Sequence, residues 1–222
     1  MKKRVLVVAP HPDDETLGCG GTLMRLHQQG AELAWLIVTG ISEEYGWTAE
    51  RVQQRDEEID QVAKLMGFSE VFNLQLPTTR LDTLSMQELI NQFSVVFKAF
   101  EPEQLFLPNR SDAHTDHRVV YDAAAACTKW FRYPSIRRVL AYETLSETGF
   151  GIGAESVFDP NYFVDITGFL ERKLHVMAVY QSELGTFPFP RSVEAIRALA
   201  AVRGVASGFV AAEAFQLLRE RL

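Results

Sequence analysis

Two short segments of this 222-residue chain carry most of the side chains that could perform chemistry. The first, residues 11–15 (HPDDE), directly follows the apolar run at residues 4–9. The second, residues 109–117 (NRSDAHTDH), directly follows the apolar run at residues 104–107. Together the segments hold three of the five histidines and four aspartates. Imidazole and carboxylate groups bind metal ions and transfer protons, so the pattern favours a metal-assisted reaction.

Zinc is the cation that best matches these groups, because it accepts imidazole and carboxylate ligands and its catalytic sites need three of them. His11 and Asp14 are three residues apart across a proline-directed turn, so both can reach one ion. Asp13 then points elsewhere and can hydrogen-bond a water molecule on that ion. His114 and His117 are also three apart, and either could be a ligand, since spacing alone does not choose between them.

Acids in the first turn of a helix offer an alternative explanation of the first segment, because they favour the positive end of the helix dipole. That explanation could account for Asp14 and Glu15. It does not account for His11 at the strand end, nor for a second group of histidines and aspartates after another strand.

The elements that must position these segments alternate between apolar strands and amphipathic helices. Strands are expected at 4–9, 33–39, 70–73, 104–107 and 138–142, with an edge strand at 161–165. Helices are expected at 16–29, 49–66, 85–100, 117–127, 167–180 and 193–202. This alternation predicts the α/β class, as a Rossmann-like three-layer α/β/α sandwich with a mostly parallel sheet.

After about Glu143 the pattern loosens, and residues 146–161 read as a loop. The remainder is expected to be a C-terminal elaboration, so that residues 1–222 form a single domain. Gly18, Gly20 and Gly21 lack the third glycine of a dinucleotide fingerprint and are expected to allow close packing of a helix on the sheet. Because ligands bind at the carboxyl ends of strands in open α/β sheets, both polar segments should face one crevice.

Composition excludes several classes of partner. The chain has 22 Lys and Arg against 29 Asp and Glu, a net charge of −7, so it lacks a basic footprint for nucleic acid. Cys19 and Cys127 cannot build a disulfide framework, which indicates a reducing compartment. No run approaches the roughly 20 apolar residues of a membrane span, and the first apolar run is too short for a signal peptide. A cytoplasmic protein is expected, and a homo-oligomer is left open.

The HPDDE segment together with H-x-D-H at 114–117 resembles the PIG-L/LmbE-like N-acetylglucosaminyl deacetylase family. Further along, Arg55 to Glu58, with Ala63 and the LMG at 65–67, is similar to the R-x-x-E…A…LG helix of that family. Lys173 and the YQSE at 180–183 resemble its K…SQ region, with Glu183 where glutamine is more usual. The AEAF at 212–215 resembles its terminal AE-x-F.

The resemblance implies a role for each matching residue. It implies one zinc ion, or iron or another divalent metal, held by His11, Asp14 and His117. Asp13 would be the general base. His114 would stabilise the oxyanion and protonate the leaving amine, with Asp116 holding its ring. An imidazole paired with an aspartate is biased toward the protonated form, as an acid should be.

Other residues are candidates for substrate binding. The guanidinium of Arg55 could bind a carboxylate or phosphate of the substrate, or it could simply pair with an acid of its own helix such as Glu58. Trp47 or Tyr45, after the second strand, could stack on a sugar ring or anchor the loop. Tyr142, at another strand end, is a candidate for the pocket lining.

These observations lead to the expectation of a zinc-dependent deacetylase. Metal-activated water would hydrolyse the N-acetyl group of an N-acetylglucosamine-type sugar conjugate, a small molecule, and release acetate and a free amine. Three alternatives stay open. They are a metal-dependent amidohydrolase acting on a non-sugar N-acyl amine, a phosphoesterase, whose sites usually hold two ions, and a non-catalytic carbohydrate-binding module.

Overall fold

The structure, a computed structural model, describes residues 2–152 and 157–222. Its strands are β1 (Arg4–Ala9), β2 (Glu32–Gly40), β3 (Glu70–Pro77), β4 (Gln104–Pro108), β5 (Arg138–Tyr142), β6 (Tyr162–Asp165) and β7 (Ala212–Glu220). Its helices are α1 (Asp14–Gln28), α2 (Ala49–Met66), α3 (Met86–Phe100), α4 (Thr115–Ala126), α5 (Leu170–Met177) and α6 (Val193–Ser207). Part of the loop expected at 146–161, residues 153–156, lies outside the described residues.

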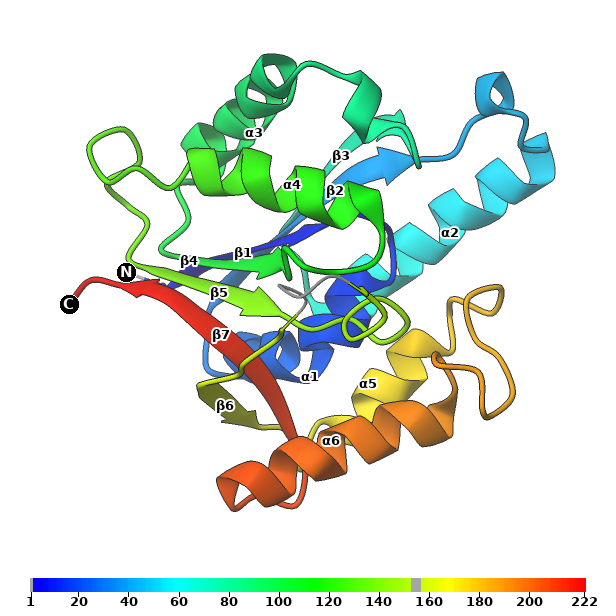
Figure 1. Cartoon of the computed structure of the whole chain (residues 1–222), viewed down its shortest axis with the longest axis vertical. Helices are drawn as coiled ribbons and strands as arrows, with labels where there is room; N and C mark the ends of the chain where they lie inside the picture. The colour runs from blue at the N-terminus through cyan, green and yellow to red at the C-terminus, as the bar shows by residue number, and fades with distance from the viewer. Residues whose placement is uncertain (1, 153–156) are drawn as a thin grey trace.

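The strands form one sheet in the order β3-β2-β1-β4-β5-β7-β6 (Figure 1). The pairs among β3, β2, β1, β4 and β5 are parallel, whereas β7 runs antiparallel to both β5 and β6. Helices α3 and α4 cover one face of the sheet, and α1, α5 and α6 cover the other (Figure 1). The expected three-layer α/β architecture with a mostly parallel sheet is therefore confirmed.

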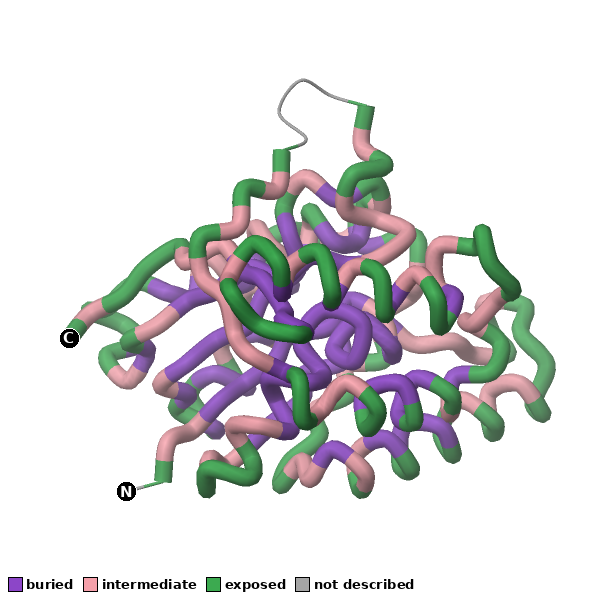
Figure 2. Tube along the Cα trace, turned by 90° about the horizontal axis from the view of Figure 1, so that it is seen from below, coloured by how far each residue is buried: buried purple, intermediate pink, exposed green. Residues whose placement is uncertain are grey.

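Burial on both faces explains the continuous apolar run of β1. Val5 and Val7 pack into the core on the side of α1, while Leu6 and Val8 pack on the side of α3 and α4. All four side chains are fully buried, as expected for a central strand between two helical layers. Figure 2 shows the buried residues gathered at the centre of the molecule and the exposed residues around its outside.

β7 is the element that the sequence did not predict as a strand. Its residues (AEAFQLLRE) include alanine, glutamate and leucine, which favour strands weakly or not at all. Pairing with β5 and β6 imposes the extended conformation instead. The expected edge strand at 161–165 is confirmed as β6.

The glycines of α1 let this helix approach the sheet closely, as expected. A Cβ atom on Gly18 would lie 2.2 Å from the ring of Tyr142, and one on Gly21 would lie 2.7 Å from Ile166. α1 matters for function because it begins at Asp14, within the first polar segment.

A buried ion pair anchors α1 to the C-terminal elements. The helix is kinked at Cys19, where φ is −146° and ψ is 18°. Just after the kink, the carboxylate of Glu213 accepts hydrogen bonds from the main-chain N–H of Gly21 at 2.9 Å and of Thr22 at 2.7 Å. Lys173 of α5 donates to the same carboxylate at 2.7 Å. β7 and α5 thus hold the helix that carries the first polar segment.

Within the described ranges, none of the helices combines the length and the apolar character needed to cross a membrane.

Candidate metal and active site

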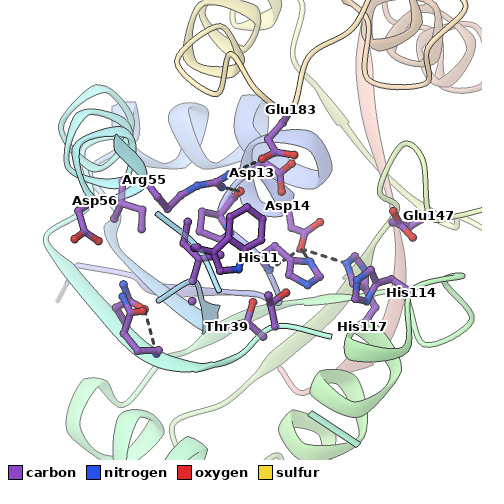
Figure 3. Close-up of a pocket in the computed structure, with 18 of the residues that line it drawn as sticks. His11, Asp13, Asp14, Thr39, Arg55, Asp56, His114, His117, Glu147 and Glu183 are labelled. Carbon is purple, nitrogen blue, oxygen red and sulfur yellow. Dashed lines mark hydrogen bonds and ion pairs between the residues drawn. The ribbon is translucent and has the colours of Figure 1, made fainter. Parts of the chain in front are cut away.

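The two polar segments meet at the carboxyl edge of the sheet. β1 and β4 are parallel neighbours, so the residues that follow them lie side by side. The ligand atoms of His11, Asp14 and His117 all lie within 4.8 Å of one another. Figure 3 shows these three side chains directed toward one another at one end of a pocket.

Asp14 stands between the two histidines. Its Oδ2 lies 3.3 Å from Nδ1 of His11 and 3.3 Å from Nε2 of His117. Nε2 of His117 is buried, and among the described residues it makes the Asp14 contact but no well-formed hydrogen bond. A metal ion shared with Asp14 and His11 would satisfy this nitrogen.

Each of the two histidines also contacts a second carboxylate through its other ring nitrogen. Nδ1 of His117 lies 2.8 Å from Oδ2 of Asp112, and Nε2 of His11 lies 3.2 Å from Oδ2 of Asp116. Carboxylates in this position fix the tautomer and orientation of metal-binding histidines. The donor set of His11, Asp14 and His117 therefore fits a divalent cation such as zinc.

A second trio, His11, His114 and Asp116, also lies within reach of one ion. Asp116 is less available than Asp14, because its Oδ2 already accepts a hydrogen bond from the main-chain N–H of Thr79 at 2.7 Å. This trio also lacks an orphaned nitrogen such as that of His117. The first trio is the better metal site.

The Asp116 carboxylate lies closer to His11 than to His114. Its Oδ2 is 3.2 Å from Nε2 of His11 and 3.9 Å from Nδ1 of His114. His114 is the N-cap of α4, and its Nδ1 accepts a hydrogen bond from the main-chain N–H of Asp116 at 3.1 Å. This cap, rather than the aspartate side chain, orients the His114 ring.

Charge interactions among the side chains of the metal trio shift the pKa values of all three. Burial lowers the pKa of His11 and His117, but the surrounding aspartates outweigh it and raise the two values to about 9 and about 10. Burial acts to raise the pKa of Asp14, yet the histidines hold it well below its usual range. The cluster therefore attracts positive charge, and a metal ion that binds there would displace protons from the imidazoles.

His114 behaves differently from the other two histidines. Burial and the neighbouring His11 lower its pKa to about 4, and the charge of Asp116 does not compensate. This direction is opposite to the expected bias toward the protonated form. Because Nδ1 accepts the Asp116 N–H, the proton of the neutral ring is on Nε2. His114 is thus a hydrogen-bond donor at neutral pH.

Asp13 lines the pocket beside the metal trio in a strained conformation. Its φ is 128°, which is rare for any residue other than glycine, and such strain accumulates at functional sites. Burial, with the charges of Asp14 and Glu183, raises the pKa of Asp13 well above its ordinary value. A carboxylate with a raised pKa is suited to accept a proton near neutral pH.

Glu15 holds Asp13 in this conformation, a role that the sequence did not reveal. The carboxylate of Glu15 is fully buried and accepts the main-chain N–H of Asp13 at 3.0 Å. It also accepts the hydroxyl groups of Thr16 at 2.6 Å and Tyr180 at 3.0 Å. Burial raises the pKa of Glu15 to about 7. The dipole explanation of Glu15 is therefore insufficient.

The pocket has a volume of about 330 Å³, within the range of small-molecule sites. It brings together Arg55 and Trp47 as expected, but not Tyr142. Tyr142 is fully buried, its ring packs on α1, and its hydroxyl donates to the main-chain oxygen of Val8 at 2.8 Å. The expectation that Tyr142 lines the pocket is wrong, because its side chain points into the core.

Arg55 combines both expected arrangements, since it lines the pocket and also pairs with acids. Its Nε lies 3.1 Å from Oε2 of Glu58, and its Nη2 contacts Glu183. Its Nη1 donates to the main-chain oxygen of Pro12 at 2.9 Å. Arg191 lines the pocket as well. The sequence did not single out as pocket residues the other polar members of the lining, which are Thr39, Asp56, Asn73, Gln75, Thr78 and Glu147.

Comparisons with known proteins agree on one family. The sequence model of PIG-L, described as GlcNAc-PI de-N-acetylase, matches residues 6–128. The chain is 26% identical over 199 residues to the diacetylchitobiose deacetylase of Thermococcus kodakarensis, covering 86% of this chain and 72% of that protein. It is 30% identical over 151 residues to the uncharacterized deacetylase YaiS of Escherichia coli, covering 65% and 76%.

Among solved structures, one similar to this chain is N,N′-diacetylchitobiose deacetylase from Pyrococcus horikoshii in complex with an inhibitor. It has a TM-score of 0.78 and 25% sequence identity, with 98% of this chain and 84% of that chain covered. The similarity thus extends over the C-terminal elements as well as the matched residues 6–128.

Proposed function

Because the chain belongs to the PIG-L family, we propose that it is a zinc-dependent deacetylase that hydrolyses the N-acetyl group of an N-acetylglucosamine-type sugar conjugate. The observation that carries this proposal is the convergence of His11, Asp14 and His117 beside the strained, buried Asp13. The names of the chitobiose deacetylases support the substrate class.

His11, Asp14 and His117 would hold the ion, with Asp116 and Asp112 fixing the two imidazoles. A divalent ion bound there would supply Lewis acidity, which can polarise an amide carbonyl and lower the pKa of water. Every other step falls to side chains of this chain.

Asp13 accepts the proton of the attacking water. It lies in the pocket next to Asp14, and its raised pKa makes it a base that can also return the proton. The proton then goes to the nitrogen of the departing amine. This assignment moves proton donation from His114, where the resemblance placed it, to Asp13.

His114 stabilises the developing oxyanion. Its pKa of about 4 makes it neutral at pH 7, and its Nε2–H is the free donor because Nδ1 is occupied by the α4 cap. A donor fixed in place before reaction is worth more than a mobile one, since it requires no reorganisation as charge develops.

The lining of the pocket suits a sugar better than an aliphatic amine. Trp47 belongs to this lining, is 42% exposed and offers a face for a sugar ring. Asn73, Gln75 and Asp56 line the same pocket and can hydrogen-bond hydroxyl groups. These polar groups favour the sugar over a non-sugar N-acyl amine.

Acetate release tests the proposal. The zinc-loaded chain is given N,N′-diacetylchitobiose, N-acetylglucosamine and an N-acetylated alkylamine at equal concentration. We expect acetate from the sugars and little from the alkylamine. Faster release from the alkylamine would contradict the sugar assignment, and no release from any of the three would contradict the deacetylase.

A further inference from the structure

A cluster of arginines and acids forms the wall of the pocket beside Asp13. We call it the arginine cluster; it consists of Arg51, Arg55, Arg191, Asp13, Glu58 and Glu183. Three arginines face three carboxyl groups in this cluster. Figure 3 shows Glu183 and Asp13 beside the end of the Arg55 side chain.

Glu183 is the member that contacts all three arginines. Its carboxylate pairs with Nη2 of Arg55, lies 3.4 Å from Nη2 of Arg191, and lies 3.5 Å from Nη2 of Arg51. The arginines around it hold the pKa of Glu183 below its ordinary value, although burial acts in the opposite direction. Glu183 therefore carries a negative charge at neutral pH.

Both arginines that line the pocket are paired with acids of the cluster. Each nitrogen of the Arg55 guanidinium already faces an oxygen, of Glu58, Glu183 or Pro12. Nε of Arg191 donates to the main-chain oxygen of Glu183 at 3.0 Å, and its Nη1 lies 3.7 Å from Asp13. Guanidinium groups frequently bind a phosphate or carboxylate through two parallel donors, and here Glu183 lies within ion-pair distance of Nη2 of both arginines.

The charge that remains in the pocket is negative. Glu147 accepts only the hydroxyl of Ser146, at 3.0 Å, among the side-chain contacts of the described residues. Asp56 lines the pocket too, and within the same described ranges no hydrogen bond or ion pair engages its carboxylate. An anionic substituent on the substrate would therefore meet like charge, whereas hydroxyl groups find the amides of Asn73 and Gln75.

We infer that Glu183 sets the charge preference of this pocket, so that it takes an uncharged sugar conjugate and rejects one that carries a phosphate or carboxylate beside the sugar. The inference rests on the proposed function for the identity of the reacting sugar. Replacing Glu183 by glutamine would keep the shape of the side chain. It would also remove the negative charge that pairs with Arg55 and Arg191 beside the pocket. The cluster would then hold three arginines against two carboxyl groups.

A matched pair of substrates tests the inference. The methyl α-glycoside and the α-1-phosphate of N-acetylglucosamine share the sugar and differ in charge. We expect kcat/KM of the zinc-loaded chain to favour the methyl glycoside by at least ~10-fold, and Glu183→Gln to move this ratio toward the phosphate by at least ~10-fold, a change of about 1.4 kcal/mol. Added salt should reduce the gain for the phosphate.

Glu147→Gln is the matched control, because it removes one negative charge from the same pocket and leaves the ion pairs of the arginine cluster intact. It should move the ratio less than Glu183→Gln does. An equal shift in the two variants would overturn the inference, as would equal use of both sugars by the unmodified chain. Thermal melting of each variant separates these results from unfolding.

Binding distinguishes failure of this inference from failure of the proposed function. If neither sugar is hydrolysed, the deacetylase proposal fails, and calorimetric binding of the same two sugars replaces kinetics. Tighter binding of the phosphate sugar to Glu183→Gln than to the unmodified chain would still support the charge preference. Unchanged binding, or no binding to either chain, would overturn it.

Discussion

Glu15→Gln would alter a buried carboxylate that holds the main chain at Asp13 in place. Oε2 of Glu15 accepts the main-chain N–H of Asp13, while Oε1 accepts hydroxyl groups from Thr16 and Tyr180. A glutamine oxygen can keep the two hydroxyl groups, but its NH₂ cannot accept from Asp13. The lost hydrogen bond is worth about 0.5–1.5 kcal/mol where Glu15 is protonated, and about 1.5–3 kcal/mol where it is charged.

The pKa of Glu15 makes the effect of this substitution depend on pH. Burial raises the pKa from 4.5 to about 7, so the folded chain holds the proton more tightly than the unfolded chain. The folded state therefore loses stability as pH rises from 4.5 through 7, by about 3.4 kcal/mol for a difference of 2.5 pKa units. About 2.5 kcal/mol of this change falls between pH 5 and 8. Glutamine does not titrate, so the variant escapes this loss.

Urea unfolding of the two chains, in chelator and at pH 5, 6, 7 and 8, measures the difference directly. His11 and His117 titrate in both proteins and cancel in the comparison. We expect Glu15→Gln to be clearly less stable than the unmodified chain at pH 5 and to gain about 2.5 kcal/mol relative to it by pH 8. A stability difference that stays constant over this range would refute the argument that Glu15 is a buried, titrating anchor.

Three further substitutions test separate parts of the site. Asp13→Asn should lower kcat by at least ~100-fold while the metal content stays the same; a variant that loses its metal and regains hydrolysis when zinc is restored would contradict the base assignment. Asp112→Asn should weaken zinc binding by ~10–100-fold in a chelator competition, because His117 loses its second contact, and unchanged affinity would speak against that role. Tyr142→Phe should leave KM unchanged but lower the free energy of unfolding by about 1 kcal/mol, since the hydrogen bond to Val8 is lost. A raised KM would instead indicate that Tyr142 contacts the substrate.

The parallel part of the sheet could be predicted because its strands are buried on both faces and read as continuous apolar runs. β1 and β2 are the clearest cases. β7 could not be found in this way, because its residues acquire their extended conformation from the antiparallel partners β5 and β6. Local preference and tertiary pairing disagree there, and the pairing prevails.

The metal trio could be predicted because His11 and Asp14 directly follow β1 and His117 lies just beyond β4. The topology then places the two segments together. The partner of Asp116 could not be predicted, since it depends on how the N-cap of α4 turns the side chain. The position of Tyr142 depends on which face of β5 its side chain takes, and it faces α1.

Sequence patterns could not predict contacts between segments that are far apart in the chain. Glu15 accepts a hydrogen bond from Tyr180, just after α5, and Arg55 of α2 pairs with Glu183, in the loop before α6. Glu183 was noticed as a departure from the usual glutamine, but its three arginine partners emerge only from the folded chain.

The central claim is that one divalent ion, held by His11, Asp14 and His117, is required for deacetylation. Zinc titration into the metal-free chain, with acetate release from N,N′-diacetylchitobiose followed at each addition, tests it most directly. Activity should be absent at first, rise in proportion to zinc, and level off at one ion per chain. Full activity without metal, or a rise that continues to two ions per chain, would contradict the account.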